Sequence, residues 1–474
     1  MKKKDHSVQQ ITNCLSADSI ILWIFTGLLF ISTASADAFG LPNEPQQPEL
    51  KISTFDVDAT SPVGTHLAYD IEINKWDLGL RARGIVILGA GQPVVLCTVD
   101  WIGIANEGYD AFREALADAA GTVPDRVTIH TVHQHDAPEC DFGAEKILKE
   151  PGVDPYCYDG TFAREVIDRL KTAVKQSLTK AVTVTQIGLG AAKVFQVASN
   201  RRIIGSNGLS RATRYSSCKD SSLRAEPEGL IDPMISLISF WNNDQPVAVL
   251  SFYATHPQSY YRTGVVNPDF PGIARFYRQL AVPQALHIHF NGAGGNITAG
   301  KYNDGSPENR RILAERLADG MKRAWESTHK ESISADKIKW NFEPLNLPIA
   351  KYVEDLQNQI KSKDPVLLAN DLSKLVWLRR YQAGKRINLE CLSLGKARVL
   401  FLPGEPFVEF QLEAKAMRKD LFVAVAGYGD YAPGYICTDK AYQEGGYESG
   451  PASGVTAGAE GVVMTAIQKL LQVK

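Results

Sequence analysis

Residues 126–139 read R-V-T-I-H-T-V-H-Q-H-D-A-P-E, and this stretch decides how the rest of the chain is interpreted. Its β-branched start predicts a strand. His133 and His135 follow two positions apart, and alternate residues of a strand point to the same face. We therefore expect both imidazoles to project into one space, with Pro138 and its acidic neighbours ending the strand. His130 has the opposite parity and is expected to pack on the other face.

Two histidines on one face form either a functional site or a buried polar pair that neighbouring groups satisfy. The chain has only nine histidines, and three acidic residues follow this pair closely: Asp136, Glu139 and Asp141. Histidine changes charge near neutral pH and is the commonest protein metal ligand. We therefore pursue the functional interpretation.

The composition is that of a globular protein, with 474 residues, 44% hydrophobic and 22% charged. This length allows one large domain or two ordinary ones. The formal net charge of -2 gives no electrostatic basis for binding nucleic acid. The chain also lacks zinc-finger spacing, a P-loop and a helix-turn-helix signature. We therefore expect a small-molecule partner and no nucleic acid; the oligomeric state stays open.

The N-terminus has the pattern of a signal peptide. Three lysines (residues 2–4) precede an apolar run over residues 20–31, and Ala34-Ser35-Ala36 follows as a cleavage site. The alternative is an uncleaved anchor. We predict a signal peptide over 1–36, a Pro- and Gln-rich linker over 37–50 and one catalytic domain over 51–474. The protein is then exported to the periplasm or the extracellular space.

Export permits disulfides, and an even number of cysteines remains after residue 36: Cys97, Cys140, Cys157, Cys218, Cys391 and Cys437. Cys140 and Cys157 bracket a polar loop and are the pair that we expect to be bridged.

Strands and helices interleave irregularly along residues 51–474. The predicted strands include 51–58, 83–88, 93–100, 182–190, 194–198, 234–241, 247–253, 286–290, 399–402 and 421–426. The predicted helices are 109–119, 162–178, one that starts at Ser306-Pro307, two pieces within 351–384 broken near Pro365, and 457–471. We therefore expect a mixed α/β (α+β) fold with a β-sheet core flanked by helices and the site on loops at strand ends.

Several of these predicted strands end in polar residues. One ends at Ala254-Thr255-His256-Pro257, and another enters Pro403-Gly404-Glu405. A third carries His287 and His289, which we expect to pack in the core, with a second metal site as the alternative. It runs into a Gly-rich turn over 291–298 that lets backbone amides approach a ligand. The Arg-rich segment 199–228 is either a solvated loop or a loop that orients anionic or polar groups over a site.

Taken in order, these blocks resemble those of the neutral (alkaline, non-lysosomal) ceramidase family of zinc-dependent amide hydrolases. Residues 133–138 resemble its H-T-H-S-G-P block, and the other matching blocks are Asn200-Arg201, residues 254–257, residues 295–298, Pro403-Gly404-Glu405, Gly434-Tyr435 and Tyr447-Glu448. The family's Ser-Gly-Pro-Gly turn is replaced in this chain by Asp136-Ala137-Pro138-Glu139. Asn296 and Thr298 stand where the family has aspartate and serine. The chain also ends without room for the C-terminal β-domain of longer members.

The resemblance implies a site as well as a family. It implies Zn²⁺ held by four side chains: His133, His256, Glu405 and Tyr435. It implies that His135, Arg201 and Tyr447 contact the substrate or the tetrahedral intermediate, with Thr298 at the family's serine position. The substrate is then an N-acyl compound, either a ceramide-like lipid or an N-acylated sugar, and peripheral membrane contact would suit the former.

Two hypotheses follow. In the first, zinc lowers the pKa of a bound water to about 7 and polarises an amide carbonyl. His135 then delivers a proton to the leaving amine, and Arg201 and Tyr447 stabilise the oxyanion. In the second, the altered positions Asn296 and Thr298 belong to a non-catalytic exported binding protein that retains the fold.

Overall fold

The computed structural model describes residues 49–74, 78–360 and 371–473. The expected signal peptide, nearly all of the linker and the break near Pro365 lie outside these residues. The chain from Gln47 onward forms one compact unit. No helix in the described ranges has the length and apolar character needed to cross a membrane.

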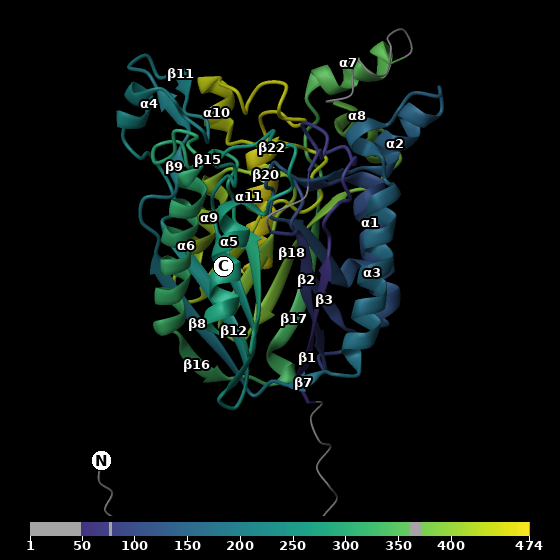
Figure 1. The fold of residues 1–474 in the computed structure, drawn as a ribbon, viewed down its shortest axis with the longest axis vertical. Helices are drawn as coiled ribbons and strands as arrows, with labels where there is room; N and C mark the ends of the chain where they lie inside the picture. Colours follow the sequence, from purple (N-terminus) through teal and green to yellow (C-terminus); the bar gives the residue numbers. More distant parts are fainter. Residues whose placement is uncertain (1–48, 75–77, 361–370, 474) are drawn as a thin grey trace, which may run out of the picture. The chain divides into compact units, whose positions relative to one another are not determined.

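The first of three main sheets has the strand order β5-β3-β2-β1-β7. Its strands are β1 (Lys51–Asp58), β2 (Arg81–Leu88), β3 (Val94–Val99), β5 (Val127–Thr131) and β7 (Val182–Thr183). Helices α1 (Asn106–Ala120) and α3 (Thr161–Leu178) pack together on its outer face, at the right of Figure 1. The apolar side chains of both helices lie on one face, which becomes buried against the sheet.

The second sheet has the order β14-β13-β12-β8-β16. Its strands are β8 (Gln186–Lys193), β12 (Met234–Asn242), β13 (Gln245–Tyr253), β14 (Leu286–Asn291) and β16 (His329–Ser332). Helices α5 (Asp269–Ala281) and α6 (Glu308–Glu326) cover it, α6 lying at the left of Figure 1.

The third sheet has the order β17-β18-β19-β21. Its strands are β17 (Ile338–Leu345), β18 (Ile387–Leu394), β19 (Ala397–Phe401) and β21 (Phe422–Ala426). Helices α9 (Val408–Met417) and α11 (Ala459–Leu470) pack against it.

The inner faces of all three sheets meet in one hydrophobic core. Ile85 comes from the first sheet, Leu250 and Phe290 from the second, and Val399 and Phe401 from the third, and all five are buried in the same cluster. Burial of apolar surface contributes roughly 25 cal/mol per Å², so this shared core fixes how the sheets are arranged. The expected mixed α/β fold with a sheet core flanked by helices is confirmed.

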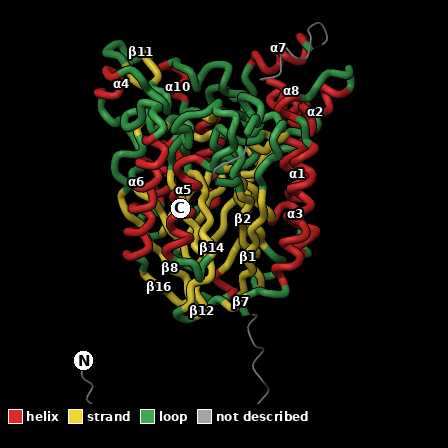
Figure 2. The backbone as a smooth tube through the Cα atoms, in the orientation of Figure 1, coloured by secondary structure: helices red, strands yellow, loops and turns green. Residues whose placement is uncertain are grey.

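Each sheet also contains one parallel pair of strands: β3 with β5, β13 with β14, and β19 with β21. The loops that follow these strands gather above the strands in Figure 2. These loops carry the histidines, the Gly-rich turn and Glu405, so the expected position of the site at strand ends is confirmed.

Short elements build that loop layer. They are β4 (Gly103–Ile104), β6 (Glu139–Cys140), α2 (Phe142–Lys149), β9 (Ser199–Asn200), β10 (Arg202–Ile204), β11 (Ser210–Thr213), α4 (Ser221–Ala225), β15 (Ile297–Thr298), α7 (Lys351–Gln359), α8 (Leu372–Gln382), β20 (Glu405–Pro406), β22 (Tyr435–Ile436) and α10 (Asp439–Glu444). The Arg-rich segment is therefore partly ordered, because β10 and β11 pair as a hairpin. The expected strand over residues 194–198 is wrong: Val194 and Val197 are buried in a loop beside α6.

The expected disulfide between Cys140 and Cys157 is also wrong. Both residues are free, as are the other four cysteines after residue 36. The Sγ atom of Cys140 packs against Gly108 of α1, whereas Cys157 packs in a separate cluster with residues of α2 and α8. The two side chains therefore point into different parts of the core.

Candidate metal centre

The histidine stretch leaves β5 before the histidines are reached. β5 ends at Thr131, so His133 and His135 lie in the following loop, and their expected position on one strand face is wrong. The backbone turns at His133, whose φ is 68°. Its N–H donates to the carbonyl of Trp101. Such a conformation costs a non-glycine residue of the order of 1 kcal/mol or more and is often found at functional sites.

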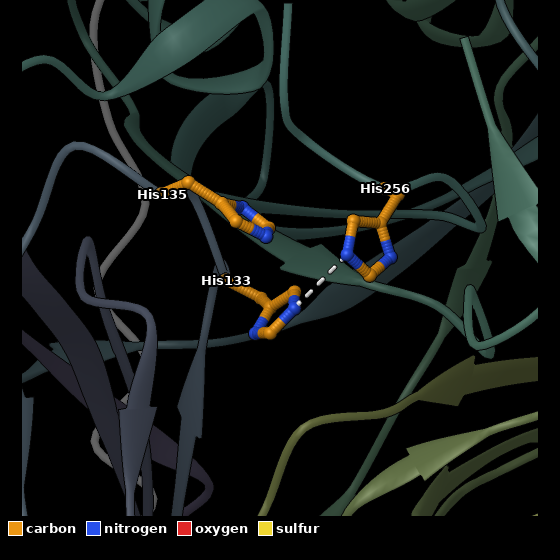
Figure 3. A group of neighbouring side chains, drawn as sticks. All are labelled: His133, His135 and His256. Carbon is orange, nitrogen blue, oxygen red and sulfur yellow. Dashed lines mark hydrogen bonds between the residues drawn. The ribbon is translucent and has the colours of Figure 1, made fainter. Parts of the chain in front are cut away.

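The loop nevertheless brings both histidines together, and His256 joins them from the end of β13 (Figure 3). The ring of His133 lies 5.0 Å from that of His135 and 4.7 Å from that of His256. All three are buried, and one nitrogen of each lies within 4.8 Å of the others. Within the described ranges this is the one group of three or more such side chains close enough to share a metal ion.

The spacing of His133 and His256 fits a zinc ion. Nδ1 of His133 donates to the carbonyl of Ile102 at 2.7 Å, which leaves a lone pair on Nε2. That Nε2 lies 3.3 Å from Nε2 of His256. Two nitrogens bound tetrahedrally at about 2.0–2.1 Å from zinc are about 3.3 Å apart. Nδ1 of His135 is buried without a hydrogen-bond partner in the described structure, as expected for a group that awaits a ligand or a proton.

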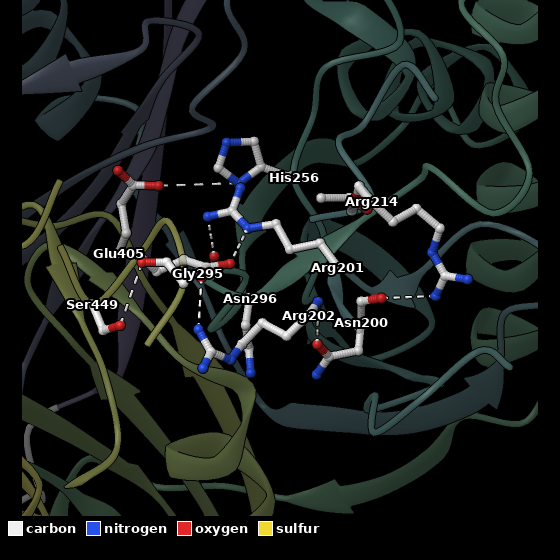
Figure 4. Close-up of polar contacts among 12 residues, drawn as sticks. Asn200, Arg201, Arg202, Arg214, His256, Gly295, Asn296, Glu405 and Ser449 are labelled. Carbon is white, nitrogen blue, oxygen red and sulfur yellow. Dashed lines mark hydrogen bonds and ion pairs between the residues drawn. The ribbon is translucent and has the colours of Figure 1, made fainter. Parts of the chain in front are cut away.

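Glu405 brings a carboxylate to this cluster from the turn after β19. Its Oε2 lies 3.4 Å from Nε2 of His133 and 4.0 Å from Nδ1 of His256, the nitrogen on the other side of that ring (Figure 4). The hydroxyl of Tyr431 donates to Oε1 at 2.9 Å. Burial acts to raise the pKa of Glu405, but His133, Arg201 and Tyr431 outweigh burial and hold this pKa below its ordinary value. The carboxylate is therefore ionised and can serve as a metal ligand.

The electrostatics keep two of the histidines neutral. Burial is the largest cause that lowers the pKa values of His135 and His256 well below the ordinary value, and the positive charge of Arg201 adds to it. Neutral imidazole is the form that binds metals and accepts protons. Both the spacing of these side chains and their protonation states therefore suit a zinc ion.

Arg201 lies beside the cluster, and two of its guanidinium nitrogens are already hydrogen-bonded. Its Nε donates to Oε1 of Glu448, and its Nη2 donates to the carbonyl of Gly295, both at 2.6 Å. Figure 4 shows the side chain running from β9 toward His256. Glu448 directly follows the candidate Tyr447, but its place in the sequence gives no sign that it pairs with Arg201.

Tyr435 and Tyr447 lie on the Arg201 side of the site. The guanidinium carbon of Arg201 is 4.8 Å from the ring centre of Tyr435 and 5.5 Å from that of Tyr447. Burial raises the pKa of Tyr435 well above its ordinary value. Of the four implied ligands, the structure thus brings His133, His256 and Glu405 together and places Tyr435 against Arg201, while His135 supplies the third nitrogen of the compact group.

Thr298 and Asn296 are engaged within the scaffold. The hydroxyl of Thr298 donates to the carbonyl of Arg214 at 3.0 Å and accepts from the N–H of Gly300 at 3.2 Å. Oδ1 of Asn296 accepts from the N–H of Val408 at 2.9 Å, which caps the start of α9. These contacts link β15 to the Arg-rich segment and to the helix that follows Glu405.

The Gly-rich turn brings backbone segments together. A Cβ atom on Gly294 would lie 2.5 Å from the carbonyl oxygen of Thr255, and one on Gly295 would lie 2.4 Å from that of Glu405. Glycine is therefore needed at both positions, because the turn packs closely against the backbone of the segments that carry His256 and Glu405. The turn therefore helps to assemble the site, and the approach of its amides to a ligand stays a prediction.

These features define a class: a three-sheet α/β domain with a buried histidine and carboxylate cluster where parallel strands end. No protein-family model matches the sequence, and no curated protein matches it. Several solved chains are similar, among them two ceramidases. The neutral ceramidase from Pseudomonas aeruginosa aligns with a TM-score of 0.63 and 16% identity over 90% of this chain and 74% of its own. A ceramidase complexed with C2 aligns with a TM-score of 0.64 and 15% identity over 90% and 75%. The chain therefore has a neutral-ceramidase-like fold, as the ordered sequence blocks predict.

Proposed function

We propose that the protein is a zinc-dependent hydrolase that cleaves the amide bond of an N-acyl compound. The neutral-ceramidase-like fold supports this proposal. The observation that carries it is the 3.3 Å spacing of the Nε2 atoms of His133 and His256, with the ionised Glu405 at 3.4 Å from His133. Two histidines and a carboxylate are an established ligand set of catalytic zinc.

His133, His256 and Glu405 would hold the ion, and the sequence resemblance adds Tyr435. When bound, zinc polarises a carbonyl and lowers the pKa of its water to about 7. His135 has two candidate roles, since it completes the three-nitrogen group and also has a free Nδ1. Three histidines are also an established zinc ligand set.

In the role that we propose, Nδ1 of His135 takes a proton from the attacking water and returns it to the leaving amine. Tyr69 stacks on His135 with ring centres 5.4 Å apart and planes 4° from parallel, which orients the imidazole. Arg201 and Tyr447 stabilise the negative charge that develops on the carbonyl oxygen. Glu448 fixes the guanidinium of Arg201 before the substrate arrives.

The remaining parts of the proposal follow from the sequence. Residues 51–474 form the catalytic domain of a protein exported after cleavage at Ala36. Its substrate is an N-acyl compound, with a ceramide-like lipid or an N-acylated sugar as the two starting candidates, and peripheral membrane contact would accompany the lipid.

The test is the zinc content of the purified protein, measured beside hydrolysis of N-acyl substrates. We expect about one zinc per wild-type chain, lost in His133→Ala and in Glu405→Ala. His329→Ala, which changes an exposed histidine of β16, is the matched control and should keep both zinc and activity. In His135→Gln, retained zinc with lost hydrolysis indicates proton transfer, and lost zinc indicates a third nitrogen ligand.

Two results would contradict the proposal. Absence of zinc from the wild type after zinc has been supplied rules out a zinc hydrolase. Zinc that is bound without hydrolysis of any N-acyl substrate supports the non-catalytic binding protein instead.

A further inference from the structure

Two tyrosines and an arginine lie on the solvent-exposed side of His135. Tyr69 stacks on the imidazole, and the ring of Tyr261 lies 5.6 Å from it. The two tyrosine rings contact each other edge to face at 5.1 Å. The guanidinium carbon of Arg262 is 5.7 Å from the ring centre of Tyr69 and 5.4 Å from that of Tyr261. One aromatic ring thus links the guanidinium to His135.

The guanidinium of Arg262 is available to bind an anion. The residue is exposed, and no carboxylate of the described residues forms an ion pair with it. Arg201 differs from it, because its Nε is already hydrogen-bonded to Glu448 and its Nη2 to Gly295. Stacking on tyrosine faces holds a guanidinium in place while its N–H groups stay free for a planar, doubly accepting anion such as a carboxylate.

The backbone at Arg262 is built to present this side chain. Its φ is 63°, a left-handed conformation that is unfavourable for a non-glycine residue. The buried carboxylate of Asp136 maintains it, because Oδ1 accepts the N–H of Arg262 at 2.8 Å and Oδ2 accepts the hydroxyl of Thr263 at 2.9 Å. Arg310 lies 3.5 Å from Oδ2 and balances the charge. Asp136 stands where the resembling family block has serine. The hydrogen bonds that hold the Arg262 backbone therefore come from a residue in which this chain departs from that block.

We propose that the substrate is an N-acyl amino acid, whose carboxylate is received by Arg262. This inference rests on the proposed function, in which His135 protonates the leaving amine. A group recognised one ring away from His135 therefore belongs to the amine half of the substrate. In an N-acyl amino acid a single carbon separates the carboxylate from the scissile nitrogen, whereas the amine half of ceramide carries no charge.

The reaction is hydrolysis and needs no co-reactant besides water. The water oxygen bonds to the carbonyl carbon, and the carbon–nitrogen bond breaks with its electron pair on nitrogen. The nitrogen receives the proton that His135 took from the water. The products are a carboxylic acid and a free amino acid.

The experiment compares N-dodecanoylglycine with N-dodecanoylethanolamine, which matches it in length but is uncharged. We expect the zinc-loaded wild type to favour the glycine compound at least tenfold in kcat/KM. Arg262→Gln should lower that ratio at least tenfold, chiefly through KM, and Arg262→Lys should lower it less because it keeps the charge without the planar fork. Arg311→Gln, an exposed arginine of α6, should leave the ratio unchanged.

A wild type that favours the ethanolamide, or a ratio that Arg262→Gln does not change, overturns the inference while leaving the hydrolase proposal intact. An equal loss on both substrates also overturns it. If neither compound is hydrolysed, the proposed function fails, and calorimetry then decides the inference separately. Binding of N-dodecanoylglycine that weakens at least tenfold in Arg262→Gln supports it, and no binding to the wild type rejects it.

Discussion

At the scale of single residues, the pairing of Arg201 with Glu448 offers a direct test. Glu448 is fully buried and accepts from Arg201 and, at 2.8 Å, from Arg202. Glu448→Gln replaces one acceptor oxygen with an amide donor that faces a guanidinium. Removing one partner of a buried ion pair typically costs about 3–5 kcal/mol. We expect a loss of about 3 kcal/mol in the free energy of unfolding, measured by chemical denaturation.

The control for this prediction is Glu444→Gln, which removes a carboxylate that pairs with Arg202 at 3.1 Å but leaves Arg201 untouched. A smaller loss of about 1 kcal/mol is expected there. Equal losses in the two variants would show that the buried pair adds nothing beyond an ordinary charge contact.

At the scale of elements, the turn after β14 is the most sensitive segment of the site. In Gly295→Ala the new methyl group would meet the backbone oxygens of Glu405 and Pro406, which cannot rotate away. Overpacking of this kind costs about 1–3 kcal/mol, and we expect a loss of about 2 kcal/mol in the free energy of unfolding together with weaker zinc binding, measured by denaturation and metal titration.

The control is the same change at Gly461 of α11, where the new methyl group meets nothing within 4 Å and the free energy of unfolding should rise by about 0.5–1 kcal/mol. A Gly295→Ala protein as stable as Gly461→Ala would contradict the assigned packing.

The elements also show what sequence can and cannot predict. The alternation of apolar Phe55 and Val57 with Asp56 and Asp58 helps to predict a strand over residues 51–58, which are the bounds of β1, because alternation is a local property. The left-handed turn at His133 is not encoded by any local preference and depends on the neighbouring loop around Trp101. Glu448 is 247 positions from Arg201 along the chain, so only the folded arrangement reveals their pairing. Tyr69 likewise lies in an irregular loop whose sequence gives no sign that it will stack on His135.

At the scale of the whole molecule, a buried ion pair joins two of the three sheets and predicts how stability depends on pH. Glu390 lies in β18 of the third sheet, and its Oε1 is 3.6 Å from Nη2 of Arg113 on α1, which covers the first sheet. Burial raises the pKa of Glu390 to about 7, and Arg113 and Thr128 offset only part of that rise. Because this pKa is raised in the folded state, the stability linked to the bound proton is complete below the unfolded value near 4.5 and is lost as the pH rises through about 7.

Relative to Glu390→Gln, the wild type should therefore lose on the order of 2–3 kcal/mol of unfolding free energy between pH 4.5 and 8. Denaturant titrations at several pH values measure this difference, with the exposed Glu413→Gln as a control that should run parallel to the wild type. Parallel curves for Glu390→Gln and the wild type would mean that the carboxyl does not change protonation on unfolding, and that the junction between the sheets does not depend on its charge.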